Sequence, residues 1–449
     1  MRKNILILGM YAVFLAGSIP VLSSTGPKDG DDSSQQPTFP KQTFGNIVCR
    51  EQTIQYMRPT NQCGINMFET PETTDVPFTG FRVNWGAGFT QEFQSLKHRN
   101  DTEPPIELAR IGWGFGRAFA NLNLHAQLAP GVRLQLTSYL SSRHHEDTWV
   151  KDGYVQIDQL PLTLGMLTAL WDRFVTLKVG HMEINYGDAH FRRSDGGEGM
   201  YNPFVGNLLL DSFTTEIGAE AYLHAGGIFL MGGITGGEIH GDVQNSQNRM
   251  PAFLWKAGYD RQVKPDLRIR LTASNYVVRK SPGSTLYFGD RAGSHYWGAL
   301  ESEPWSDVSQ AWSGRINPLF RNKVTAYQIN PFVKYKGLEL FGVIEHAAGL
   351  TYPETVNRTW NQYALDTVYR FFEDRLYIGA RYNHAEGQLP GIDNRVRVRR
   401  FQAGGGWFLI PYLLLKAEFV AQYHHDYPMD HIDYNGHFHG VTISAVLAF

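Results

Sequence analysis

Apolar and polar residues alternate along most of the chain beyond residue 80. In the last stretch, Val441, Ile443 and Leu447 share one face, whereas Thr442 and Ser444 lie on the other. A period of two residues is typical of β-strands with one apolar face. Such runs occur sixteen times, at 81–89, 118–128, 132–140, 153–157, 175–179, 217–223, 228–234, 253–259, 267–273, 327–335, 338–344, 363–369, 376–382, 396–407, 415–423 and 439–449. The pattern predicts an all-β protein.

The connections between these runs alternate in length. Short ones lie at 129–131, 224–227, 263–266, 336–337, 372–375 and 410–412, and long ones at 97–109, 142–148, 185–212, 236–251, 280–324, 347–359, 384–394 and 424–437. An even number of strands with short turns at one end is typical of transmembrane β-barrels. A secreted β-sandwich also alternates, but it has no reason to keep this phase. We predict a transmembrane antiparallel β-barrel of about 16 strands with both termini on the periplasmic side. The connection at 159–173 departs from the pattern and predicts a short helix under the barrel.

The segment before the barrel has three parts with different compositions. Arg2 and Lys3 precede an apolar run at 5–16, which is typical of a signal peptide over residues 1–24 and is too short to span a membrane. We expect residues 25–79 to form a periplasmic linker and a disulfide-clipped N-terminal segment that could partly plug the barrel, and residues 80–449 to form the outer-membrane β-barrel. Cys49 and Cys63 have no metal-type spacing, so in an oxidising compartment we expect a structural disulfide worth about 3 kcal/mol.

Charged residues at the alternate positions would face inward if the apolar positions face lipid. Charges inside a membrane protein need water or partners, so this register predicts a solvated lumen. Basic residues outnumber acidic ones there, and basic side chains in a confined pore attract anions. Alternatively, they pair with inward acids in salt-bridge networks of the wall. The predicted pore-lining residues are Arg268, Arg270, Arg395, Arg397, Arg399, Arg133, Lys178 and Lys334.

The long connection at 185–212 is the candidate for a pore-narrowing loop. It carries five charged or titratable residues in a Gly-bounded stretch: Asp188, His190, Arg192, Arg193 and Asp195. Folded into the barrel, these side chains would form a constriction. Folded outward, they would be ordinary solvated loop residues.

Other chemistry receives little support. The net charge is −2, and −4 without Arg2 and Lys3, so nucleic-acid binding is not indicated. The sequence has no G-x-S-x-G or H-E-x-x-H motif, so we expect neither an enzyme nor a cofactor. Histidines cluster at 424–439 and 144–145, but their spacing matches no established metal site and a polar rim loop explains them. We therefore predict no metal site.

The span from Gly64 to Phe449 resembles the porin-type barrels of Gram-negative outer membranes. The terminal strand resembles the one that the outer-membrane assembly machinery recognises. The stretches 64–69 (GINMFE), 181–193 (HMEINYGDAHFRR) and 202–204 (NPF) are similar to those of Bacteroidota-like barrels, and distantly to phosphate-selective porins. The basic signature loop of that subfamily is not clearly present. The resemblance implies localisation in the cell outer membrane, with the lipid bilayer and the assembly machinery as partners.

These observations favour a channel for passive diffusion of small polar solutes, with a preference for anions as the narrower expectation. The first alternative is a non-conducting barrel that acts as a scaffold or partner in an envelope complex. It rests on Trp297, Trp305 and Trp312 in the loop at 280–324, since exposed tryptophans often mark contact surfaces. A weaker alternative is a hydrolase at the rim, using the pair Asp430-His431. Whether the chain forms a homotrimer is left open.

Overall fold

The computed structural model describes residues 52–142, 148–241, 249–289, 293–306 and 310–449. The predicted signal peptide, the first half of the predicted linker and Cys49 lie outside the described residues. Within them the strands are β1 (Arg82–Arg99), β2 (Trp113–Phe115), β3 (Phe119–Ala129), β4 (Val132–Ser141), β5 (Trp149–Ile157), β6 (Val175–Glu183), β7 (Thr215–Ala225), β8 (Ile228–Thr235), β9 (Ala252–Lys264), β10 (Leu267–Val278), β11 (Lys323–Tyr335), β12 (Leu338–Leu350), β13 (Arg358–Phe371), β14 (Leu376–Gly387), β15 (Val396–Ile410), β16 (Leu413–His425) and β17 (His437–Ala448).

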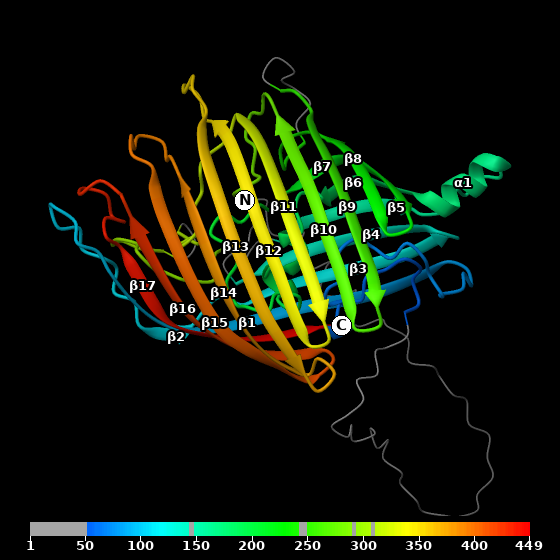
Figure 1. Ribbon diagram of the computed structural model, residues 1–449, viewed down its shortest axis with the longest axis horizontal. Helices are drawn as coiled ribbons and strands as arrows, with labels where there is room; N and C mark the ends of the chain where they lie inside the picture. The colour runs from blue at the N-terminus through cyan, green and yellow to red at the C-terminus, as the bar shows by residue number, and fades with distance from the viewer. Residues whose placement is uncertain (1–51, 143–147, 242–248, 290–292, 307–309) are drawn as a thin grey trace, which may run out of the picture. The chain divides into compact units, whose positions relative to one another are not determined.

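Sixteen of these strands form a closed antiparallel barrel. From β3 to β17 each strand pairs with the next one in the sequence, and β1 closes the ring by pairing with both β3 and β17 (Figure 1). Each of the sixteen predicted runs falls on one of these strands, so the prediction of a 16-strand barrel is confirmed. Both ends of the barrel wall, the start of β1 and the end of β17, lie at the short-turn end.

The extra strand, β2, was not predicted because it is only three residues long. It pairs with Phe93–Ser95 of β1 and extends the wall beside the upper part of that strand, where β3 no longer reaches. Trp113 and Phe115 of β2 are 79% and 81% exposed. They lie on the outward surface of the barrel.

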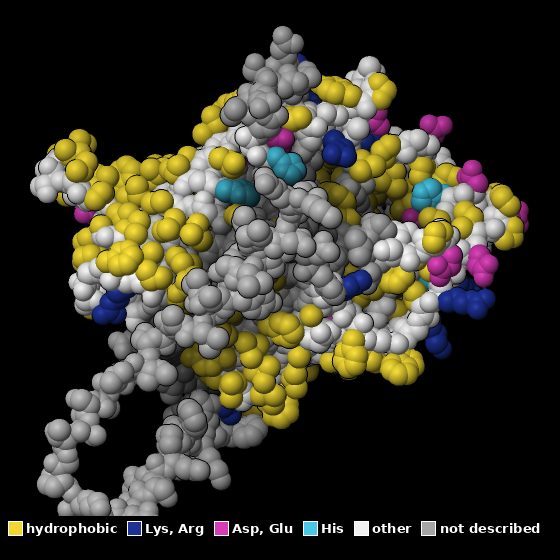
Figure 2. All heavy atoms as spheres, turned by 180° about the vertical axis from the view of Figure 1, so that it is seen from behind, with side chains coloured by type: hydrophobic (Ala, Val, Ile, Leu, Met, Phe, Trp, Pro, Cys, Tyr) yellow, Lys and Arg dark blue, Asp and Glu magenta, His cyan; other side chains and the backbone are white. Residues whose placement is uncertain are grey.

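The two faces of each strand differ as the alternation predicts. On β17, Val441 and Ile443 are 43% and 44% exposed, whereas Thr442 and Ser444 are 1% exposed. Figure 2 shows hydrophobic side chains spread over the outward surface. An outer apolar band of this kind faces hydrocarbon in outer-membrane barrels. The described part of the chain holds no helix with the length and hydropathy needed to cross a bilayer.

The predicted helix at 159–173 is confirmed as α1 (Met166–Phe174), which follows β5 and leads directly into β6. It does not lie under the barrel, because it extends away from the wall beside β5 and β6 (Figure 1). Its apolar residues are exposed, including Met166 at 78% and Leu167 at 64%.

The core of the protein lies inside the barrel. Among the described residues, three segments fill the lumen: the N-terminal segment from residue 52 to 72, the connection 184–214 between β6 and β7, and parts 279–289, 293–306 and 310–322 of the connection between β10 and β11. They contain three short 3₁₀ helices, η2 (Gln62–Gly64), η3 (Ala189–Arg192) and η4 (Gly196–Glu198). Because these segments pack on the wall from inside, many inward side chains are apolar, such as Val368, Phe332 and Val446.

Candidate functional site: the barrel lumen

The connection at 185–212 folds into the barrel, and nearly all of its residues are buried. Asp188 at its start fixes it to the wall. The Asp188 carboxylate accepts hydrogen bonds of 2.8 Å from Nε and Nη2 of Arg270 on β10, and lies 2.7 Å from Nζ of Lys256 on β9. Burial alone would raise the pKa of Asp188, but the two cations hold it below its ordinary value. The carboxylate is therefore ionised and paired.

The N-terminal segment joins the same charge network. Glu69 lies 2.8 Å from Nη1 of Arg270 and 3.1 Å from Nζ of Lys256. Burial works against its ionisation, yet these two cations hold the pKa of Glu69 well below the usual range. Two wall cations thus clamp one carboxylate from the loop and one from the N-terminal segment. The alternating pattern did not mark Glu69, and the stretch 64–69 was noted only for its resemblance to other barrels.

The other predicted loop residues lie deeper in the lumen. Arg193 makes a bidentate contact with Asp211, with bonds of 3.0 and 2.6 Å, and Asp195 pairs with Lys151 of β5. Burial opposes the ionisation of Asp211, but Arg193 and Arg315 lower the pKa of this carboxyl group to about 2. His190 contacts Glu183, and Arg192 contacts Asn66 of the N-terminal segment. The structure thus brings all five predicted loop residues inside the barrel, each with a partner.

The end of this loop is held against the opposite strands. Lys416 of β16 donates hydrogen bonds to the backbone carbonyls of Gly199 and Phe204 at 2.8 and 2.7 Å. Glu418, also of β16, accepts a bond of 2.8 Å from the amide of Val205. On β14, Arg381 pairs bidentately with Asp366 and donates to Gly206. A second set of wall charges therefore fixes the 199–206 part of the loop.

Five of the eight predicted pore-lining residues lie on the inner side of the wall. Arg270 is buried in the network described above, and Arg268 pairs with Asp260. Lys334 lies 3.2 Å from Asp374 and 3.6 Å from Glu339. Arg133 donates to Gln156, and Lys178 lies over the rings of Tyr154 and Tyr222. Most inward cations are thus paired with wall or loop groups, which is the alternative that the sequence left open.

Arg395, Arg397 and Arg399 do not line the lumen. Val396 and Val398 are fully buried on the inner face of β15, so the three arginines lie on the outer face near the long-loop end. The predicted register was wrong by one residue at 395–399, because the apolar valines face the filled lumen rather than lipid, whereas Phe401 and Trp407 face outward as predicted. The inward arginine of this strand is Arg400, which the prediction missed; it donates to Gln422 and to the carbonyl of Asn207.

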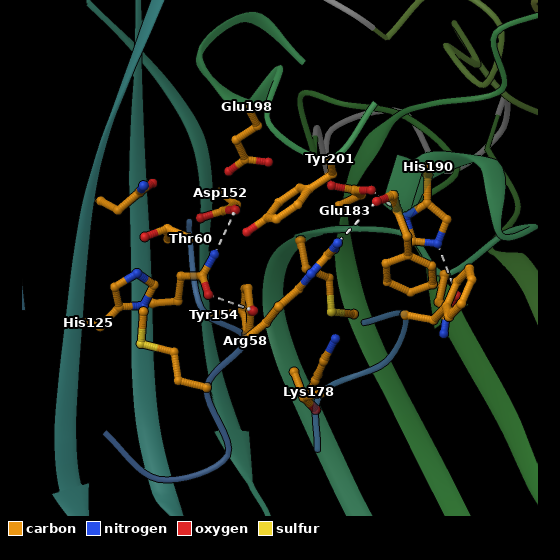
Figure 3. A pocket seen from close by; sticks show the side chains of 18 of the residues that line it. Arg58, Thr60, His125, Asp152, Tyr154, Lys178, Glu183, His190, Glu198 and Tyr201 are labelled. Atoms are coloured by element: carbon orange, nitrogen blue, oxygen red, sulfur yellow. Dashed lines mark hydrogen bonds and ion pairs between the residues drawn. The ribbon is translucent and has the colours of Figure 1, made fainter. Parts of the chain in front are cut away.

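A cavity of about 140 Å³ remains between the loop and the wall formed by β3, β4, β5 and β6. Figure 3 shows Arg58 of the N-terminal segment reaching across it, with Lys178 and Asp152 from the wall and Tyr201 and Glu198 from the loop. Burial lowers the pKa of Arg58, although nearby acids act against this effect. The cavity is lined by side chains of both charges together with amide and aromatic groups.

The wall beside this cavity carries polar groups that lack protein partners. Both ring nitrogens of His125, both amide atoms of Asn121 and Oδ1 of Asn123 have no hydrogen bond among the described residues. On β1, Thr90 Oγ1 and Glu92 Oε2 also have no hydrogen bond among the described residues. Buried polar atoms are normally satisfied by protein or by ordered water. These unpartnered groups form a polar strip along β1 and β3 beside the cavity.

The strip leads toward the periplasmic end and narrows in the other direction. His125, Met57 and Thr60 line both the cavity and a second opening of about 220 Å³ next to Phe449. Further in, η4 packs against β1 and β3. A side-chain Cβ at Gly88 would lie 2.4 Å from the carbonyl oxygen of Gly197, so only glycine permits this approach. Here the backbone of the loop lies directly against β1.

The described residues contain no group of three or more His, Cys, Asp or Glu side chains placed to hold a metal ion. The histidine cluster at 144–145 lies outside them. Cys63 is disulfide-bonded, and the chain's other cysteine, Cys49, lies outside the described residues.

No protein-family model matches the chain, and neither does any curated protein. Solved structures do resemble it. An anion-selective porin from Comamonas acidovorans matches with a TM-score of 0.50 at 11% identity, over 82% of this chain and all of the porin. The outer membrane protein OmpT of Vibrio cholerae has a TM-score of 0.49 at 10% identity, over 83% of this chain and 99% of that one. The fold is that of a porin-type barrel. The porin-type barrel confirms the predicted fold class and outer-membrane location, whereas the resemblance to Bacteroidota and phosphate-selective proteins stays a prediction.

Proposed function

We propose that this porin-type barrel is a low-conductance channel for small polar solutes. The observation that carries the proposal is the polar cavity at β3–β6, which adjoins the strip along β1 and β3 and shares His125, Met57 and Thr60 with the opening beside Phe449. The strip lies to one side of the barrel because the loop at 185–212 is clamped to β9, β10, β14 and β16. A solute would pass between the wall and the loop rather than along the barrel axis.

An anion preference is the narrower part of the proposal. Among the described residues Lys178 has no hydrogen bond or ion pair, although it faces the cavity. Its charge is therefore available to a solute, unlike the paired charges of Arg270 and Arg381. A cation in a confined polar passage attracts anions.

Planar-bilayer recordings test both parts. We expect small, stable current steps, with a reversal potential in a KCl gradient that reports anion preference. Lys178→Gln should shift the reversal potential toward cations and leave the folded barrel intact. Lys336→Gln, which removes an exposed charge at a periplasmic turn, should leave the reversal potential unchanged. An equal reversal potential in wild type and Lys178→Gln would refute the role of Lys178.

A second candidate is the non-conducting barrel, and the filled lumen favours it. The tryptophans that suggested it do not form an exposed contact surface. Trp297 is 5% exposed and packs inside against Phe119 and Tyr139, with Trp305 and Trp312 partly buried beside them. The absence of current from correctly folded protein in the same recordings would favour this candidate over the channel.

A further inference from the structure

A row of outward side chains crosses five adjacent strands near the long-loop end of the barrel. In this row each residue is the register partner of the next one: Arg99 on β1, His437 on β17, Tyr423 on β16, Arg399 on β15 and His384 on β14. Figure 1 shows β14 to β17 side by side in the wall. We call these five residues the rim row.

The rim row lies on the outer face of the wall. Tyr423 is 48% exposed and Arg99 and Arg399 are exposed, while the intervening Phe438 and Val398 are fully buried toward the lumen. The rings of Tyr423 and His437 stack at 5.8 Å, and Nε of Arg99 lies 3.4 Å from Nδ1 of His437. The row is therefore a continuous surface rather than a set of separate side chains.

The row marks the upper edge of the apolar band. Nearer the middle of the wall, Phe401 and Tyr382 are 44% and 50% exposed one outward position from the row, and Val441 is 43% exposed two positions from it, beyond His439. Aromatic and cationic side chains at such an edge meet lipid headgroups rather than acyl chains. Since both ends of the wall lie at the short-turn end, the row faces the outer leaflet.

The charge of this surface is strongly positive. Lys97 lies next to the row on β1, and neither Lys97 nor Arg399 has a hydrogen bond or ion pair among the described residues. Of the acids nearby, Asp426 pairs with Arg397, and Glu386 lies 3.7 Å from Arg395. Asp101 is close enough to His437 to act on it electrostatically, so it offsets part of the positive charge.

The same level of the wall is different on the other side of the barrel. There Ile217, Ile234 and Phe253 occupy the corresponding ends of β7, β8 and β9, and they are 46%, 47% and 54% exposed. These three strand ends therefore present apolar side chains where the rim row presents polar ones, although Arg279 and Arg321 are exposed beyond the ends of β10 and β11.

We propose that the rim row binds a phosphate-bearing lipid headgroup of the outer leaflet. Guanidinium groups match phosphate oxygens bidentately, and a cluster of cations at a membrane surface selects anionic headgroups. Arg99 and Arg399 are three strand spacings apart, about 14 Å, so the row can contact two phosphates at once. Tyr423 lies between them and presents an aromatic ring at headgroup depth.

Lipid binding by the intact purified barrel tests this proposal. Native mass spectrometry would compare lipid A carrying its phosphates with chemically dephosphorylated lipid A. We expect wild type to retain the phosphorylated lipid, and the triple variant Lys97→Gln/Arg99→Gln/Arg399→Gln to bind it at least about tenfold more weakly. The control Arg261→Gln/Lys264→Gln/Lys336→Gln removes three exposed charges at the opposite end and should bind like wild type.

Two results would overturn the proposal. Equal retention of phosphorylated and dephosphorylated lipid by wild type would show that phosphate is not recognised, and it does not depend on how well any variant folds. A change in oligomeric state of the rim variant, with lipid binding unaltered, would instead identify the row as a contact between copies of the chain. Neither result bears on whether the lumen conducts.

Discussion

At the scale of single residues, the barrel contains two arginine–aspartate ion pairs, one buried and one exposed to solvent. Arg381 and Asp366 form a bidentate cross-strand pair inside the lumen, where both side chains are 2–3% exposed. Arg397 and Asp426 form an Arg–Asp pair at the rim, where both are about 41–42% exposed. Breaking a buried pair leaves an uncompensated charge, whereas an exposed pair contributes little.

This contrast gives a stability prediction. Arg381→Gln should destabilise the folded barrel by roughly 3–5 kcal/mol, because Asp366 would remain buried without its partner. Arg397→Gln is the matched control and should cost about 1 kcal/mol or less. Urea unfolding in detergent, followed by tryptophan fluorescence, measures both. Equal losses of stability in the two variants would contradict this account.

At the scale of elements, alternation predicted the strands well but not always their inward faces. On β15 the apolar pair Val396 and Val398 faces inward, and the neighbouring arginines face outward. The rule that apolar residues face lipid assumes a wet lumen. Here packed segments fill the lumen, so an apolar residue is stable on either the inner or the outer face of the wall. Periodicity alone therefore does not indicate which face of a strand is the inner one.

The loop between β16 and β17 carries a pH-sensitive group. Asp433 lies 3.3 Å from Nδ1 of His424 and 3.7 Å from Nδ1 of His431. Burial, with a smaller effect of Glu301, raises the pKa of Asp433 to about 7. Burial also lowers the pKa of His431, which weakens the support that a protonated imidazole would give to this carboxylate.

The sign of the effect follows from the two pKa values of Asp433. Below 3.8 the carboxyl is protonated in both the packed and the released loop, so pH has no effect. Between 3.8 and about 7 only the released loop ionises, so the packed loop loses stability as the pH rises. We expect limited proteolysis within 426–436 to be faster at pH 8 than at pH 5. Asp433→Asn should remove this difference beyond the protease's own pH profile, and an unchanged ratio would contradict the prediction.

At the scale of the whole molecule, the wall was predictable and its filling was not. The sixteen runs and their turns follow from local patterns, and the loop at 185–212 was recognisable by its charges. Whether the N-terminal segment plugs the lumen was left open, and no local pattern indicated its contacts. Its contacts join residues far apart in sequence, such as Glu69 with Arg270 and Asn66 with Glu339. Pairings of this kind depend on the closed barrel, which no local pattern contains.

The clamp on this segment predicts how the passage is controlled. Glu69→Gln removes a charge from the network of Arg270 and Lys256, so the segment should dissociate more readily and the single-channel conductance should rise. Glu72→Gln is the control, because Glu72 is about half exposed and its one described ion-pair contact is with His224 at 3.4 Å. Equal conductance in the two variants would show that the segment does not limit the current.

The ring of strands closes through β1 and β17, which are paired from Gly88–Ala448 to Arg99–His437, and Ala87 and Phe449 exchange two further backbone hydrogen bonds of 3.0 Å. The first strand of the wall, β1, therefore keeps one unpaired edge until the last strand, β17, pairs with it. Until β17 has been delivered, the sheet has two open margins whose amides and carbonyls cannot be left in hydrocarbon. Insertion strand by strand during export is thus disfavoured, and the barrel must be held as a nearly complete sheet until both margins meet.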